Sequence, residues 1–293
     1  MEHFPITAER YSGTYGLLSK KPPRTGVIFV HGFRGKARGT WGDFELLIEQ
    51  VGIQRSLWSE CDLWFYSYRS RDQVRPLAEE FVEFLLDVAT KRESTVIGSS
   101  YVLPSSEKLI LGVPADLAGL RSQKEYADII LVGHSAGAVI IREAVRLILT
   151  KMENSDFYPT ILNASLRLFA PAHRGVIAAD KLGAARATPF LGTIVALYLQ
   201  SNPLYQNLKI GSPTIVDLRR VTEQLYAERQ IAALRAAVLF GKHEEIVDVG
   251  GYSHDEELPT EPGHSHTTIC KPTKRFLKPL EFVIDRSAIA KNA

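Results

Sequence analysis

The sequence of 293 residues has only two cysteines, Cys61 and Cys270, which excludes a disulfide framework and a four-cysteine zinc site. It contains neither a Walker A loop nor a G-x-G-x-x-G motif, so a nucleotide cofactor has no support. The 35 basic and 33 acidic residues nearly cancel, and a net charge of +2 provides no overall field that favours nucleic acid or an anionic membrane.

Long hydrophobic runs are also missing. The most apolar stretch, 190–199, is too short to span a bilayer and contains Gly192 and Thr193. The N-terminal residues show no basic segment followed by an apolar core, so we expect no secretory signal and a soluble, cytoplasmic protein. Hydrophobic residues make up 45% of the chain, which is typical of a globular protein, and we expect a single domain over 1–293.

Short apolar runs alternate with longer segments of helical periodicity, which predicts an α/β fold with a mostly parallel sheet between helices. The predicted strands are 26–30, 63–68, 128–132, 166–170 and 236–240. The predicted helices are 75–89, 136–150 and 273–284, the last interrupted by Pro279. Two segments fit the alternation poorly. Residues 94–112 predict a loop or hairpin of unknown role, and the apolar helical pattern of 175–212 predicts an insertion packed over the sheet.

The pentapeptide Gly133-His134-Ser135-Ala136-Gly137 lies between a predicted buried strand and a predicted amphipathic helix. This is the context of a G-x-S-x-G nucleophile elbow, where a tight turn exposes the serine hydroxyl at the sheet edge. Glycines allow the turn to close against its neighbours because they have no Cβ. The helix that follows directs its N-terminal N–H groups at the serine, where they favour negative charge. The alternative is a glycine-rich turn with an inert serine.

Two further segments carry a family resemblance. His31-Gly32-Phe33 follows the first buried strand, and Pro171-Ala172-His173-Arg174-Gly175 follows a later one. With the elbow, they make the sequence resemble the α/β-hydrolase fold superfamily, in its serine esterase and lipase branch. The resemblance implies a central sheet flanked by helices, a helical cap or lid at 175–212, and no cofactor. It also implies a catalytic triad in the chain order serine, acid, histidine.

The resemblance places the catalytic histidine on a loop ahead of the C-terminal helix. His266 fits this place, because Ile269 and Lys271 follow it at a spacing that is common in related lipases. His264 lies on the same loop and stays open as the alternative. The role of the histidine is to remove the proton of Ser135.

The triad acid is expected after strand 236–240, where Gly241-Lys242-His243-Glu244-Glu245-Ile246-Val247 resembles the family's G-x-x-D-x-x-V. Glu244 stands at the position of the aspartate, and a glutamate can also accept the imidazole N–H and fix its tautomer. Glu245 and Asp248 stay open as alternatives. The resemblance further implies an oxyanion hole formed by the backbone N–H groups of Phe33 and Ala136.

Three basic residues share the loop after the HG pair, Arg34, Lys36 and Arg38. With Arg174 they are expected to form a positive rim that attracts a substrate with a phosphate or carboxylate group, and the alternative is a solvated basic loop. His173 is expected to line the substrate pocket. We assign Arg34, His173 and Arg174 to substrate binding.

The sequence therefore predicts a serine carboxylesterase or lipase-like enzyme that acts on a small-molecule ester or lipid, without nucleic acid, metal or cofactor. His254-Asp255-Glu256-Glu257 and His264-x-His266 offer potential metal ligands, but no H-E-x-x-H motif accompanies them. The same triad also suits thioester, amide or acyltransferase chemistry. A non-catalytic binding protein with this fold is a further alternative. Acyl length and oligomeric state stay open.

Overall fold

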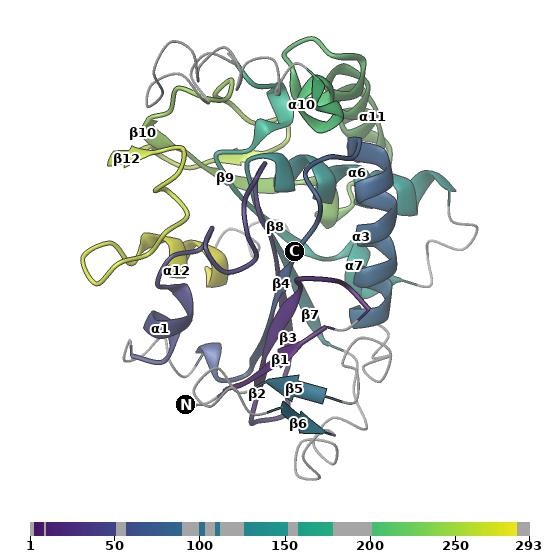
Figure 1. The fold of residues 1–293 in the computed structure, drawn as a ribbon. Helices are drawn as coiled ribbons and strands as arrows, with labels where there is room; N and C mark the ends of the chain where they lie inside the picture. Colours follow the sequence, from purple (N-terminus) through teal and green to yellow (C-terminus); the bar gives the residue numbers. More distant parts are fainter. Residues whose placement is uncertain are drawn as a thin grey trace.

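The computed structural model describes residues 3–8, 10–50, 57–89, 100–102, 109–111, 126–151, 158–177 and 201–285. An eight-stranded sheet with the order β1-β2-β4-β3-β7-β8-β9-β11 runs through its centre (Figure 1). The strands are β1 His3–Thr7, β2 Tyr15–Ser19, β3 Thr25–Val30, β4 Cys61–Tyr66, β7 Asp128–His134, β8 Ser165–Phe169, β9 Ala236–Leu239 and β11 Glu256–Glu257. The pairs β1–β2 and β2–β4 are antiparallel, and every pair from β4 to β11 is parallel. The predicted mostly parallel sheet is confirmed.

The central strands are buried on both faces, as their continuous apolar sequences predict. All six residues of β3 and of β4 are buried, and β7 is buried from its second residue onward. Such strands occur where helices cover both faces of a parallel sheet. Because the carboxyl ends of parallel strands meet at one edge, β3, β7 and β8 deliver the loops after 30, 134 and 169 to the same place.

Helices cover the sheet on both faces (Figure 1). One face carries α3 Val74–Ala89, α6 Ala136–Lys151 and α11 Pro213–Arg229, and the other carries α1 Phe44–Ile48 and α12 Lys278–Ile284. The predicted helix over 273–284 begins only at Lys278. Pro279 does not interrupt it but stands in its first turn, where the missing N–H has no partner to lose.

Smaller elements complete the described chain. β5 Ser100–Val102 and β6 Leu109–Leu111 form an antiparallel pair, and the rest of the predicted loop or hairpin at 94–112 lies outside the described residues. β10 Gly241–His243 pairs with β12 Glu261–Ser265 in parallel. The short helices α7 and α10 cover Pro159–Leu162 and Pro203–Leu208.

The predicted cap lies mostly outside the described residues, since 178–200 are not among them. Its described end contains α10, whose Leu204, Tyr205 and Leu208 are buried. In the described parts of the chain, no helix combines the length and apolar character needed to cross a membrane.

Candidate active site

Ser135 lies on a tight turn between β7, which ends at His134, and α6, which begins at Ala136. Its φ of +53° falls in the left-handed region, where a residue with a Cβ is strained. Neighbouring backbone holds it there. The Ser135 N–H donates to Phe169 O at 3.1 Å, and the Ala172 N–H donates to Ser135 O at 3.1 Å. This is the backbone geometry that a nucleophile elbow requires.

The glycines around Ser135 are required by close approach of neighbouring chain. A Cβ on Gly137 would lie 2.1 Å from Val30 O, and a Cβ on Gly133 would lie 2.8 Å from the Cα of Ala138. Both distances are shorter than van der Waals contact with backbone atoms that have no room to move. The two outer positions of G-x-S-x-G therefore allow β3 and α6 to pack against the turn.

A chain of hydrogen bonds connects three of the predicted residues. His266 Nε2 lies 2.9 Å from Ser135 Oγ, and His266 Nδ1 lies 3.0 Å and 3.1 Å from the two carboxylate oxygens of Glu244. The side chains of His266 and Glu244 are 7% and 2% exposed, which shields their interaction from water. The structure thus brings together Ser135, His266 and Glu244, which are far apart in sequence.

Glu244 is held in place by its own loop. Its Oε1 accepts hydrogen bonds from the N–H groups of Ile246 at 2.8 Å and Val247 at 3.1 Å. These bonds leave Oε2 directed at His266. The alternative acid Asp248 instead forms an ion pair with Arg174 at 2.9 Å.

His266 is positioned by buried neighbours in its loop. The Ile269 N–H donates to Ser265 O at 3.1 Å, and both Ile269 and Cys270 are fully buried. The Cys270 thiol donates to Thr40 O at 3.4 Å, which connects this loop to the 33–41 loop. The alternative His264 stacks on Phe276 with ring centroids 3.6 Å apart and is not joined to Ser135.

His134, directly before the serine, contacts the His266 loop in a way that the sequence alone does not predict. Its Nε2–H donates to His266 O at 2.8 Å, and the two rings lie 5.0 Å apart. Burial, together with the nearby His266, lowers the pKa of His134 to about 3, so the ring is neutral at physiological pH. A neutral ring donates from Nε2 and leaves Nδ1 as an acceptor, and that buried Nδ1 has no partner among the described residues.

A cavity of about 430 Å³ opens over the serine. Ser135, His134 and His266 lie on its wall together with two apolar side chains, Phe33 and Ile246. Three basic residues also line it, Arg34, Lys36 and Lys271. Of the two predicted oxyanion donors, Phe33 is in the cavity lining, and Ala136 directly follows Ser135 at the start of α6. Among the described residues, no group of three or more metal-ligating side chains could hold a metal ion.

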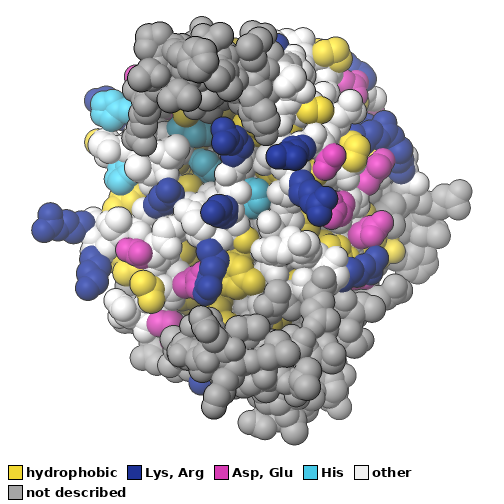
Figure 2. Space-filling view, viewed as in Figure 1, with side chains coloured by type: hydrophobic (Ala, Val, Ile, Leu, Met, Phe, Trp, Pro, Cys, Tyr) yellow, Lys and Arg dark blue, Asp and Glu magenta, His cyan; other side chains and the backbone are white. Residues whose placement is uncertain are grey.

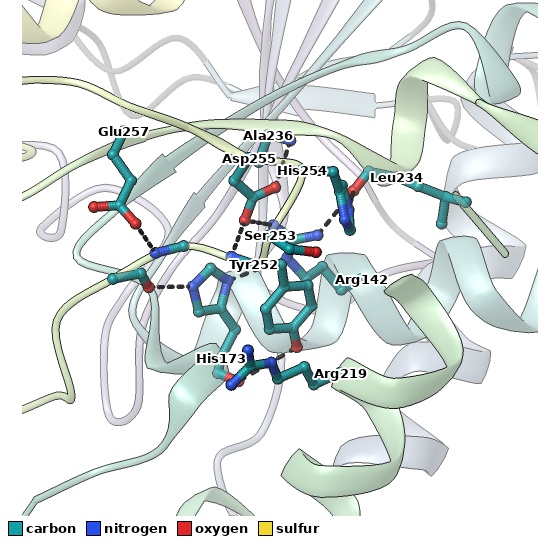
Figure 3. A network of polar contacts seen from close by, with 12 residues as sticks. Arg142, His173, Arg219, Leu234, Ala236, Tyr252, Ser253, His254, Asp255 and Glu257 are labelled. Carbon is teal, nitrogen blue, oxygen red and sulfur yellow. Dashed lines mark hydrogen bonds and ion pairs between the residues drawn. The ribbon is translucent and has the colours of Figure 1, made fainter. Parts of the chain in front are cut away.

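The structure does not bring His173 and Arg174 into this cavity. His173 is fully buried, and it accepts from Arg142 Nε at 3.2 Å and donates from Nε2 to Gly250 O at 2.9 Å (Figure 3). Burial and the charge of Arg142 lower the pKa of His173 to about 3, so it is neutral. Arg174 is paired with Asp248. Of the predicted substrate-binding residues, only Arg34 lines the cavity.

The surroundings of His173 form a polar network that joins α6 to the chain after β10 (Figure 3). Arg142 on α6 pairs with Asp255 at 2.5 Å, donates to Leu234 O at 2.9 Å and lies over the ring of Tyr252. Asp255 in turn accepts from two backbone N–H groups. The side chains of Arg142 and Asp255 are 1% and 0% exposed, so this network holds the framework behind the site.

Comparisons with known proteins identify the fold. Esterase B from Lactobacillus rhamnosis, solved with a tributyrin phosphonate, is 12% identical with a TM-score of 0.50 over 95% of this chain and 83% of that one. Lipase BlEst2 from Bacillus licheniformis is 16% identical with a TM-score of 0.49 over 95% and 96%. Phospholipase PlaB from Legionella pneumophila is 20% identical with a TM-score of 0.43, and the match covers 74% of this chain.

The present chain spans 37% of the length of PlaB. No protein-family model and no curated protein sequence matches. At these low identities the likeness concerns the fold. The chain has the α/β-hydrolase fold, with its mostly parallel sheet and flanking helices.

Proposed function

We propose that this chain is a serine hydrolase that cleaves carboxylic esters through an acyl-enzyme on Ser135. The observation that carries the proposal is the chain of hydrogen bonds from Ser135 through His266 to Glu244, built on a left-handed turn at the edge of the sheet. A serine hydroxyl is a weak nucleophile, and an adjacent base that is oriented by an acid is what activates it.

In the proposed reaction His266 Nε2 takes the proton of Ser135 Oγ as this oxygen attacks the ester carbonyl. Glu244 accepts the Nδ1–H and stabilises the imidazolium. The N–H groups of Phe33 and Ala136 donate to the oxyanion of the tetrahedral intermediate. The alcohol then leaves with the proton from His266. A water molecule, deprotonated by His266, hydrolyses the acyl-enzyme.

The cavity suits an ester with a modest apolar portion. Phe33 and Ile246 contribute apolar surface next to Ser135, and a volume of about 430 Å³ lies in the range of small-molecule sites. A lipid ester is the substrate that an apolar cap at 175–212 would favour. Thioester, amide and acyl-transfer reactions use the same groups, and the bond that is cleaved is decided by how a substrate fits the cavity.

Hydrolysis of short and medium p-nitrophenyl esters tests the proposal. Wild type should release p-nitrophenol, Ser135→Ala should lose nearly all of this activity, and Ser12→Ala, which alters an exposed serine elsewhere, should keep it. Folded wild type without turnover of esters would contradict ester hydrolysis. Equal turnover by wild type and Ser135→Ala would contradict the role of Ser135.

A further inference from the structure

The basic residues at the cavity come from two separate segments that face each other. Arg34 and Lys36 belong to the 33–41 loop, and Lys271 belongs to the loop that carries His266. The hydrogen bond from Cys270 Sγ to Thr40 O joins these segments. A Cβ on Gly42 would lie 3.2 Å from the Cβ of Lys271, which shows how closely they pack. Basic residues from both segments therefore line the cavity that contains the serine.

The 33–41 loop has a fixed conformation. The Gly35 N–H donates to Gly32 O at 2.9 Å, and the Thr40 N–H donates to Lys36 O at 3.2 Å. A Cβ on Gly35 would lie 2.7 Å from Thr40 Oγ1, so the loop closes tightly on itself. At its end Trp41 is 1% exposed and packs against Phe29. The backbone that carries Lys36 is therefore already ordered before a ligand binds.

The two lysines at the cavity differ from other cations of the described chain in their charge partners. No acidic side chain lines the cavity in the described parts of the chain, and neither Lys36 nor Lys271 has an ion pair there. Nearby cations outside the cavity lining differ in this respect, since Arg38 pairs with Glu45 at 3.0 Å. Figure 2 shows Lys and Arg side chains around histidines on this face of the molecule.

The position of Lys36 extends the site beyond the serine. Besides the cavity at Ser135, Lys36 lines a second cavity of about 480 Å³, which Tyr15 and Arg38 also line. Gly35 and Lys36 line both cavities, so an elongated ligand that reaches from one to the other passes this part of the loop. Lys271 is half-buried and its charge acts within the site, because it contributes to the lowered pKa of His134.

We propose that Lys36 and Lys271 form an anion subsite, and that the preferred substrate is an ester carrying a carboxylate or phosphate group. This inference rests on the proposed ester hydrolysis at Ser135. One ammonium from each segment binds an anionic oxygen group while the ester carbonyl lies at Ser135. Lysine is suited to this task as a compact point charge with three donors.

The test compares two matched esters. Mono-p-nitrophenyl adipate carries a free carboxylate, and its methyl-capped analogue differs only by lacking that charge. Wild type should show a higher kcat/KM for the anionic ester. Lys36→Gln combined with Lys271→Gln should lower kcat/KM about tenfold for the anionic ester, in line with two partly exposed charge pairs, and less than twofold for the capped one. The matched control Lys274→Gln alters an exposed lysine on the same segment and should change neither value.

Inorganic phosphate gives a second readout that does not depend on where the substrate carries its charge. It should inhibit hydrolysis of the capped ester by wild type, and the inhibition constant should rise about tenfold in the double lysine variant. A different result would overturn the anion subsite and leave the proposed function intact. In that result both esters are hydrolysed, and the double variant changes kcat/KM equally for the two esters and leaves the inhibition constant of phosphate unchanged. If the wild type hydrolyses neither ester, the proposed function is overturned, and this inference with it.

Discussion

Glu244→Gln is expected to lower kcat sharply because of how its two oxygens are used. Oε1 accepts from the N–H groups of Ile246 and Val247, so the glutamine oxygen has to occupy this position. The glutamine NH₂ then takes the position of Oε2, which lies 3.0 Å from His266 Nδ1. The glutamine oxygen, 3.1 Å from Nδ1, already accepts from two N–H groups, so the NH₂ donor favours the tautomer in which Nδ1 accepts and the histidine proton is on Nε2.

His266 Nε2 lies 2.9 Å from Ser135 Oγ. A proton on Nε2 prevents this nitrogen from taking the proton of the serine. Replacing the triad aspartate of a serine protease with asparagine, the corresponding acid-to-amide change, costs about 10⁴-fold in kcat through the wrong tautomer, and we expect a loss of that order here. Because Gln is isosteric and keeps both backbone bonds, the free energy of unfolding should change by less than about 1 kcal/mol.

The assay is p-nitrophenyl ester hydrolysis, with a urea unfolding curve for each variant. Glu245→Gln is the matched control on the neighbouring residue, and Asp248→Asn tests the other alternative acid. Both should keep activity within about tenfold of wild type, since Glu244 is the acid that is hydrogen-bonded to His266 and Asp248 pairs with Arg174. The reasoning is refuted if Glu244→Gln stays within tenfold of wild type while Glu245→Gln or Asp248→Asn loses activity.

Three further predictions concern the framework. Gly137→Ala places a Cβ 2.1 Å from Val30 O and should cost at least about 3 kcal/mol in urea unfolding; a near-neutral effect would show that the turn relaxes. Arg142→Leu leaves the buried Asp255 carboxylate without its ion pair and should cost about 3–5 kcal/mol by the same measurement, whereas a loss below 1 kcal/mol would contradict this. The lowered pKa of His173 gives stability that is present above pH 6.5 and lost as pH falls toward 3. Stability should therefore drop by up to about 1.4 kcal/mol per pH unit in this window, and an unchanged slope in His173→Phe would refute the assignment.

The sheet could be predicted from sequence because its central strands are continuous apolar runs. Such runs can be recognised from local composition alone, without knowledge of distant contacts. The turn at Ser135 was also readable, since Gly133 and Gly137 stand where neighbouring backbone leaves no room for a side chain. Pro279 was misjudged because a proline in the first turn and one inside a helix look alike until the start of the helix is known.

The surroundings of the site were harder to predict, because they depend on contacts between distant segments. His173 follows β8 in the expected loop, yet Arg142 from α6 and Gly250 from a later loop draw its ring away from the cavity. Lys271 entered the sequence argument only through its spacing from His266. Its place in the same cavity as Lys36 arises from packing of the 33–41 loop against Cys270, which no local pattern encodes.

The central claim is that Ser135 is the nucleophile, and covalent labelling tests it most directly. A fluorophosphonate should add one group per molecule of wild type, and peptide mapping by mass spectrometry should locate it on Ser135. His266→Ala should label far more slowly, because the hydroxyl loses its base. Labelling of another residue in wild type, or equal labelling of Ser135→Ala, would contradict the account.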